Sequence, residues 1–239
     1  MSFIRVESDV NRIWIETDDT GKMTIFKDIG ILPKILELVN IYSEISDVVP
    51  KFSIDNECAK FEFITFNNPE LYSKYQNYGA LGLYTINNKL PNTVIPNFLE
   101  KVDIESLCKV LLFAIVCGYR DFANRNIMLR FHDNKISFVL IDFEHAFKFC
   151  DRAMSTDLLD FGKVSKELMK LVHFDKKMID YVRNTTLENQ SLFTKRHVRH
   201  ITIFLDMLEK KDGLHSDILR EFLDEWWNLD AYEKMYNEK

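Results

Sequence analysis

The spacing of apolar residues changes along the chain, and this change predicts strands first and helices later. Apolar and polar side chains alternate in four early segments, which is typical of strands with one buried face. These segments are residues 12–17, 23–28, 50–54 and 59–66. Between the second and the third, residues 31–45 have apolar side chains at helical spacing, with Pro33 tolerated in the first turn. The predicted order is strand, strand, helix, strand, strand, with a turn at Thr20-Gly21 inside the first pair.

The later part of the chain is predicted to be mainly helical. Residues 104–118 are apolar on almost every side, which indicates a buried helix, and residues 126–143 form two apolar runs around the turn sequence HDNK. A Ser/Thr/Asp cap signal begins a helix in residues 155–172, and amphipathic helical spacing continues to the C-terminus. The turn-rich, aromatic segment 67–97 is expected to be a connection that carries short structure.

These patterns predict an α+β chain with two lobes. Residues 1–67 are expected to form a small β-rich N-lobe with one helix, and residues 68–239 a larger helical C-lobe. A chain of 239 residues is long enough for two such lobes around a cleft.

Composition and charge narrow the class of protein. Apolar residues make up 46% of the chain and charged residues 28%, which is ordinary for a soluble globular protein with a core. The net charge of −6 gives no general attraction to nucleic acid, and the basic run KRHVRH at residues 195–200 is interpreted as a helix face. The longest apolar run is far too short to span a membrane. None of the four cysteines belongs to a CxxC pair, so we expect reduced core thiols, no zinc site and a cytoplasmic location.

Three polar residues stand where apolar segments end. Asp121 and Asn126 follow the predicted buried helix in GYRDFANRN, and Asp142 ends the apolar run FVLI. One predicted hairpin separates Asn126 from Asp142. Carboxylate and amide oxygens suit Mg²⁺, and phosphoryl transfer depends mainly on positioning and on neutralising phosphate charge. The three residues are therefore candidates for a phosphoryl-transfer site.

In these segments the sequence resembles the protein-kinase-like superfamily. YRDFANRN is similar to the catalytic loop H-R-D-L-x-x-x-N at Arg120, Asp121 and Asn126, and IDF is similar to the metal-binding D-F-G at Asp142. The resemblance implies a bilobal protein-kinase-like fold that uses ATP and Mg²⁺. Asp121, with Arg120 beside it, would act as the catalytic base or orient the acceptor hydroxyl, and Asn126 and Asp142 would bind the metal.

Two further matches fall in the order that the family has. The strand sequence TIFK resembles V-A-I-K, so Lys27 would hold the ATP phosphates. The helix after it offers Glu37 or Glu44 as the partner of the lysine, and spacing favours Glu44. DLLDFG resembles the start of the kinase helix D-V-W-S-F-G, in which Asp157 would brace the catalytic loop.

The sequence also departs from the family pattern. No glycine-rich loop precedes Lys27, Glu144 replaces the glycine of D-F-G, and only a short segment separates Asp142 from Asp157. This compactness resembles atypical members such as HipA-type toxin kinases, phosphoinositide kinases and small-molecule kinases. The expected function is an ATP-dependent kinase whose acceptor is a protein Ser/Thr hydroxyl or another molecule. A small-molecule kinase and a catalytically weak, pseudokinase-like binding or regulatory module are the alternatives.

Overall fold

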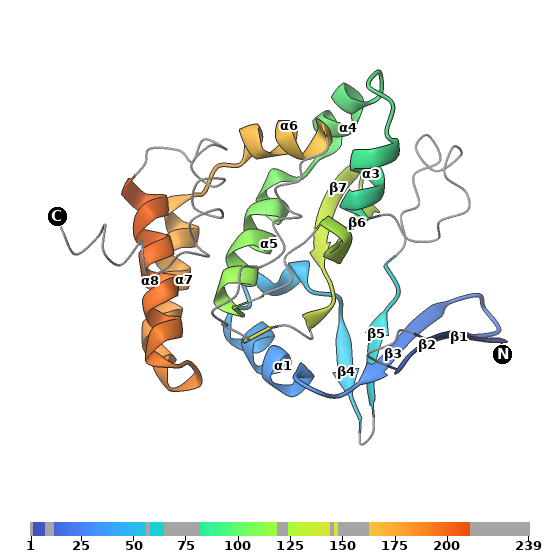
Figure 1. Cartoon of the computed structure of the whole chain (residues 1–239), viewed down its shortest axis with the longest axis horizontal. Coiled ribbons are helices and arrows are strands. Elements are labelled where there is room, and N and C mark those ends of the chain that lie inside the picture. Colours follow the sequence, from blue (N-terminus) through green and yellow to red (C-terminus); the bar gives the residue numbers. More distant parts are fainter. Residues whose placement is uncertain are drawn as a thin grey trace.

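A computed structural model shows a small antiparallel sheet together with several helices, a mixed α+β arrangement as the sequence pattern predicts (Figure 1). The described residues are 2–7, 12–55, 58–64, 82–118, 124–143, 146–147 and 163–210. Buried apolar residues form a continuous cluster that extends from the first helix through the centre of the molecule to the last described helices. No helix within these ranges has both the length and the apolar character needed to cross a membrane.

The larger sheet has five strands, and every neighbouring pair is antiparallel in the order β1-β2-β3-β5-β4. Its strands are β1 (Ser2–Glu7), β2 (Arg12–Thr17), β3 (Met23–Asp28), β4 (Phe52–Ile54) and β5 (Cys58–Glu62). In the central strand β3, Lys27 lies opposite Ile13 on one side and Ala59 on the other. Directly opposed residues share a face of a sheet, so Lys27 is on the same face as the fully buried Ala59.

The four predicted strands are confirmed, and β2 and β3 turn where the sequence predicts. The Thr20 N–H donates to Asp18 Oδ1 at 2.9 Å, and Gly21 has a φ of +83°, a value that favours glycine. The sequence pattern does not predict β1. Phe3 and Ile4 are adjacent apolar residues, and they break the alternation in that segment.

Helix α1 (Leu32–Ile41) follows β3 and buries one side. Pro33 lies in the first turn, where a missing N–H costs little. The buried positions are Leu32, Ile35 and Leu38. The helix ends at Ile41 and is capped by Tyr42, whose N–H donates to the Leu38 carbonyl at 2.8 Å, so it is shorter than the predicted 31–45. The single turn η1 (Ser46–Val48) comes next.

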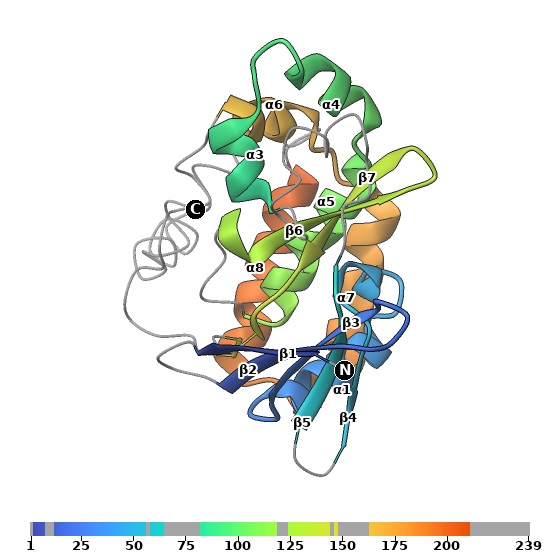
Figure 2. The same ribbon diagram turned by 90° about the vertical axis from the view of Figure 1, so that its right-hand side faces the viewer.

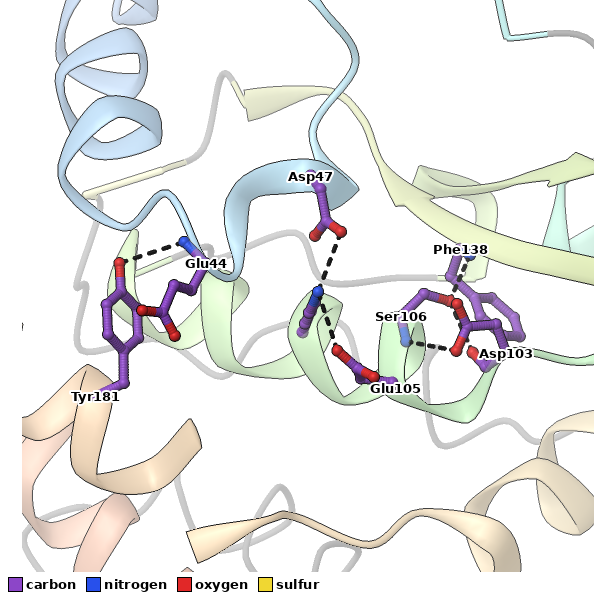
Figure 3. Close-up of polar contacts among 8 residues, drawn as sticks. Glu44, Asp47, Asp103, Glu105, Ser106, Phe138 and Tyr181 are labelled. Atoms are coloured by element: carbon purple, nitrogen blue, oxygen red, sulfur yellow. Dashed lines mark hydrogen bonds and ion pairs between the residues drawn. The ribbon is translucent and has the colours of Figure 1, made fainter. Parts of the chain in front are cut away.

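The predicted buried helix and the predicted hairpin are both present, and they occupy the centre of the molecule. These elements are α5 (Ile104–Val116), β6 (Ile127–His132) and β7 (Lys135–Leu140). Asp103 caps α5 by accepting a hydrogen bond from the Ser106 N–H at 3.4 Å. The Ser106 hydroxyl in turn accepts a hydrogen bond from the Phe138 N–H at 3.0 Å, which joins the start of α5 to β7 (Figure 3).

The remaining helices surround this centre. They are α3 (Leu83–Lys89), α4 (Ile95–Lys101), α6 (Lys163–Leu171), α7 (Lys176–Glu188) and α8 (Lys195–Lys210), with the single turns η2 (Asn124–Asn126) and η5 (Gln190–Leu192). Helices α3, α4 and α6 lie at one end of the molecule and the five-stranded sheet at the other, with the hairpin between them (Figure 2). Helices α7 and α8 pack against each other. The predicted helix 155–172 is confirmed over the residues of α6, and the predicted connection carries α3 and the start of α4.

Candidate functional site

Two strand ends that are distant in sequence meet beside the hairpin. Lys27 lies near the end of β3, and Asp142 follows β7. The Lys27 Nζ is 3.0 Å from the Asp142 Oδ1. The two side chains are 18% and 34% exposed, so the pair is only partly accessible to water. The structure therefore brings together the residue expected to hold phosphate and one of those expected to hold metal.

The backbone of Asp142 has an uncommon conformation. Its φ is +68°, in the left-handed region that few residues other than glycine adopt. Contacts on both sides hold it: the Ile141 N–H donates to the Asn126 carbonyl at 2.9 Å, and the buried Phe143 ring meets Phe113 edge-on, with centroids 6.3 Å apart. A conformation of this kind persists where the surroundings over-determine it, and functional sites are common places for it.

Asn126 lies at the same end of the hairpin as Asp142. It ends η2 and directly precedes β6, where Ile127 pairs with Leu140. The bond between the Asn126 carbonyl and the Ile141 N–H continues the ladder by one step, so the backbones of Asn126 and Asp142 are close together. Asn126 is buried, with 5% of its surface exposed. The predicted hairpin is confirmed, and it places these two polar residues on adjacent strand ends.

A second ion pair joins the sheet to the hairpin, and sequence reasoning missed it. Arg130 on β6 donates through Nη2 to the Oε1 of Glu62 at the end of β5. The Lys51 N–H donates to the same oxygen at 2.9 Å. Both charged side chains are about one-third exposed, at 30% and 32%. No local sequence pattern predicts this ion pair, because its residues lie on β5 and β6, which belong to different sheets.

The structure does not bring Glu44 to Lys27. Helix α1 ends at Ile41, so Glu44 lies beyond its last turn, and its backbone N–H donates to the Tyr181 hydroxyl of α7 at 3.3 Å (Figure 3). Glu37, the alternative partner, is exposed on α1. Asp142, a carboxylate that contacts Lys27, comes from the hairpin.

Three predicted site residues, Arg120, Asp121 and Asp157, lie outside the described residues. The described residues after α5 end at Gly118. Its φ is +55°, and its N–H donates to the Ile115 carbonyl at 3.0 Å. Glycine in the left-handed conformation just after a helix is a common way to end it. Helix α5 therefore ends shortly before residues 119–126, which carry the catalytic-loop match.

Asp142 and Asn126 are the described residues best suited to hold Mg²⁺. Carboxylate and amide oxygens are the hard ligands that this ion prefers. A carboxylate has several lone pairs, so Asp142 keeps lone pairs for a metal ion while it contacts Lys27. Within the described ranges, no three His, Cys, Asp or Glu side chains are grouped as a metal site. Mg²⁺ commonly completes its coordination with phosphate and water.

The described part of the site thus combines the Lys27 ammonium with the Asp142 carboxylate, and it places Asn126 at the adjacent strand end. Such a set can bind an oxyanion at the lysine and a divalent cation at the carboxylate. No protein-family model matches the chain, and a search of curated proteins finds no significant match. The function is therefore inferred from the residues and contacts of the chain itself.

Proposed function

We propose that the chain is a Mg-ATP-dependent phosphotransferase that moves the γ-phosphate of ATP to a hydroxyl acceptor. The observation that carries the proposal is the 3.0 Å approach of Lys27 to Asp142. These residues match the phosphate-binding lysine and the metal-binding aspartate of protein-kinase-like proteins. They are 115 positions apart in the chain, so local structure alone does not explain their contact.

Each residue has a role that fits its chemistry. Lys27 would hold the phosphates, and Asp142 and Asn126 would hold Mg²⁺, which supplies positive charge for the phosphate oxygens. Asp121, with Arg120 beside it, would orient the acceptor hydroxyl or take its proton. Because Glu44 lies away from Lys27, Asp142 would also be the group that fixes the lysine before nucleotide binds.

The proposal includes a bilobal protein-kinase-like fold, with residues 1–67 as the small lobe and 68–239 as the larger one. The sheet and α1 at one end and the helices beyond the hairpin support it (Figure 1). Asp157 would brace the catalytic loop from the larger lobe. A reducing, cytoplasmic setting is proposed from Cys108 and Cys117, which are free and buried thiols. The acceptor would be a protein Ser/Thr hydroxyl or a small molecule.

Asp142→Asn is the sharpest test, because asparagine tolerates the left-handed backbone and keeps the side-chain shape while it removes the negative charge. We expect Mg-dependent ATP turnover or autophosphorylation to fall by about a hundredfold or more. Binding of metal-free ATP, measured by calorimetry, should be unchanged or tighter, because a carboxylate that competes for Lys27 has been removed. Turnover that survives this substitution would refute the proposal.

Glu62→Gln is the matched control. Glu62 is the carboxylate of the other ion pair between sheet and hairpin, and its exposure of 32% is close to the 34% of Asp142. We expect this variant to keep turnover within about threefold of the unmodified chain, since a partly exposed ion pair contributes little to stability. An equal loss in both variants would mean that general damage to the sheet–hairpin contact explains the effect.

A catalytically weak binding module is the second candidate. The charges of Lys27 and Asp142 already neutralise each other. Glu144 replaces the glycine of D-F-G, and residues 6–16, where the phosphate-covering loop is expected, contain no glycine. Thermal unfolding with and without Mg-ATP separates the candidates, because a ligand present at a hundred times its dissociation constant stabilises the folded state by about 2.7 kcal/mol. No shift at millimolar Mg-ATP, together with no turnover, would favour the module over the enzyme.

A further inference from the structure

Two lysines that are close in sequence contact the two ends of the segment that begins with Asp142. The Lys27 Nζ, near the end of β3, is 3.0 Å from the Asp142 Oδ1. The Lys34 Nζ, in the first turn of α1, is 3.9 Å from the centre of the Phe147 ring, on the face that attracts a cation. Phe147 follows Asp142 by five positions. An ion pair thus holds the beginning of the segment, and a cation–π contact holds its end.

Strand β3 and helix α1 support the two lysines as one compact unit. Only residues 29–31 separate the strand from the helix. The Leu32 N–H donates to the Ile29 carbonyl at 2.9 Å, which closes the turn between them. The buried side of α1 belongs to the central core cluster. Residues 23–41, the β3–α1 unit, therefore carry Lys27 and Lys34 on one support.

Contacts among described residues connect Phe147 to Asp142. The Ala146 N–H donates to the Phe143 carbonyl at 2.9 Å. This bond links the residue before Phe147 to the residue after Asp142. The Phe147 N–H also donates to the Cys117 carbonyl at 2.8 Å. Asp142 and Phe147 both have left-handed backbones, with φ of +68° and +58°. Such conformations need surrounding contacts to hold them, so a contact that fixes Phe147 also helps to fix Asp142.

The two lysine contacts differ in what nucleotide binding does to them. In the proposed reaction the phosphates take Lys27 and Mg²⁺ takes Asp142, so the ion pair must open. Phosphate and metal bind neither Lys34 nor Phe147 in that reaction. The attraction between the Lys34 ammonium and the aromatic ring therefore continues while the ion pair is open.

We infer that Lys34 is a positioning residue for the proposed phosphotransfer site. Its contact with Phe147 holds the Asp142 segment against the β3–α1 unit after Lys27 has exchanged Asp142 for phosphate. Lys34 thereby helps to set the distance between the lysine that holds phosphate and the aspartate that holds metal. The inference rests on the proposed function for the roles of Lys27 and Asp142. The contact itself can be tested without nucleotide.

Lys34→Gln is the first variant, because it removes the charge without adding a methionine sulfur, which would itself attract the ring. In the full chain without ligand, we expect hydrogen exchange of the Phe147 and Ile141 amides to become about fivefold faster, the factor that loss of one cation–π contact gives. The Tyr42 amide, which is bonded to the Leu38 carbonyl at the end of α1, should stay within about twofold. Unchanged exchange at Phe147 and Ile141, or equal acceleration at Tyr42, would overturn the inference.

Two further variants serve as controls for the exchange measurement. Lys34→Arg keeps a cation over the ring, so both amides should stay within about twofold of the unmodified chain. Lys60→Gln is the matched control, because the Lys60 ammonium lies 5.9 Å from the centre of the Phe26 ring, on the same sheet as Lys27. It should leave the Phe147 and Ile141 amides within about twofold as well. Equal acceleration in either control would overturn the inference.

Turnover supplies the second readout. We expect kcat for Mg-ATP turnover to fall about fivefold in Lys34→Gln and to recover in Lys34→Arg, because misplaced reacting groups slow the chemical step. KM for ATP should stay within about twofold, since Lys27 still holds the phosphates. Faster exchange with an unchanged kcat would overturn the positioning role. Absence of turnover in the unmodified chain would refute the proposed function and the role in turnover with it, and the exchange pattern would then show only whether Lys34 holds the segment.

A double-variant test shows whether the charge acts through the ring. Phe147→Leu should lower kcat by the same factor of about five, and adding Lys34→Gln to it should lower kcat by less than about twofold further. A full additional loss would mean that the lysine charge acts on the site from a distance, which would overturn the role of the Phe147 contact. If Phe147→Leu fails to fold, the comparison of Lys34→Gln with Lys34→Arg decides: equal kcat losses in the two variants overturn the inference.

Discussion

Two of the contacts between the early and the later part of the chain differ in kind. Tyr42, just after α1, is fully buried, and its hydroxyl lies 2.9 Å from Thr186 Oγ1 on α7. The Thr186 hydroxyl donates its hydrogen to the Val182 carbonyl at 2.7 Å, so Tyr42 is the donor to Thr186. Lys27 and Asp142 instead form a charged pair that remains partly exposed.

The difference shows which of the two contacts can open. A buried hydroxyl pair cannot separate without leaving a polar group unpaired, at a cost of about 1–3 kcal/mol. Burial also raises the pKa of Tyr42 to about 12, so the ring stays neutral. A partly exposed ion pair is worth only about 0–1 kcal/mol, and incoming charges can replace it. The Tyr42 contact therefore fixes the arrangement, and the Lys27 contact can exchange partners.

The largest expected effect is at Tyr42. Tyr42→Ala removes a fully buried ring and its hydrogen bond, so we expect the free energy of unfolding to fall by about 3–5 kcal/mol. Urea denaturation measures this loss. The control is Leu187→Ala on α7, where the side chain is 50% exposed and the expected change is within about 0.5 kcal/mol. Equal losses in the two variants would contradict a fixing role for Tyr42.

The next effect is a loss of stability at acid pH, and it arises from the buried histidines of α8. Burial lowers the pKa of His197 and of His200 to about 4, from an ordinary value near 6.5. Below about pH 6.5 the unfolded chain binds protons that the folded chain does not take up until about pH 4. Stability is thus complete above this window and is lost as the pH falls through it, by up to about 3 kcal/mol for each histidine.

Thermal unfolding at several pH values between 7 and 4.5 measures this loss. The charges of His200 and of Lys34 from α1 also lower the pKa of His197, and those of Arg196 and Arg199 lower the pKa of His200. Carboxylates also begin to take up protons near the lower end of this pH range. A variant with both histidines replaced by phenylalanine therefore shows how much of the stability loss is due to the histidines. A pH profile that is the same with and without the two histidines would rule out this explanation.

The sequence predicts the elements of this protein better than its contacts. Alternation predicts the strand that carries Lys27, and two apolar runs around HDNK predict the hairpin that places Asn126 beside Asp142. These features depend on apolar residues that repeat every few positions, and such repeats can be seen directly in the local sequence. The prediction of Glu44 as the partner of Lys27 depended on where α1 ends, and helix ends are the least certain part of such a pattern.

The basic run at residues 195–200 shows the same limit. It was interpreted as a helix face, and it does lie at the start of α8, but His197 and His200 within it are buried. Their spacing of three puts both on one side of the helix, which is the signal that could have distinguished them from the charged residues around them. The contact between His197 and Phe147 could not be predicted, because the two residues are far apart in the sequence and meet only in the folded chain.

The charged contact should show its effect in activity and little in stability. In Lys27→Met we expect kcat/KM for Mg-ATP turnover to fall about a hundredfold, because the cation on the phosphates is lost. The free energy of unfolding should change by less than about 1 kcal/mol. Steady-state kinetics and urea denaturation on the same preparation measure the two quantities. A large loss of stability with normal turnover would reverse the assignment of roles.

Lys109→Met is the matched control for that variant. The Lys109 side chain is 15% exposed, close to the 18% of Lys27, and its Nζ contacts Asp47 and Glu105, each at 3.1 Å (Figure 3). Burial lowers its pKa, but the two carboxylates more than offset this and the pKa is raised. We expect Lys109→Met to keep turnover within about threefold and to alter stability by about 1 kcal/mol or less. A hundredfold loss here as well would remove the distinction between the two lysines.

The smallest effect tests the direction of the hydroxyl bond. Thr186→Val leaves the Tyr42 O–H as a buried donor without its acceptor, so it should cost about 1–3 kcal/mol. In Tyr42→Phe the Thr186 hydroxyl loses its donor but still donates to the Val182 carbonyl, so the free energy of unfolding should fall by only about 1 kcal/mol. Adding Tyr42→Phe to Thr186→Val removes the stranded donor, so the double variant should lose less stability than the sum of the two single variants, by about 0.5–1 kcal/mol. Urea denaturation of the four proteins measures this coupling. Additive losses would mean that the two hydroxyls are not energetically coupled, and Tyr42 would then fix α1 through packing of its ring alone.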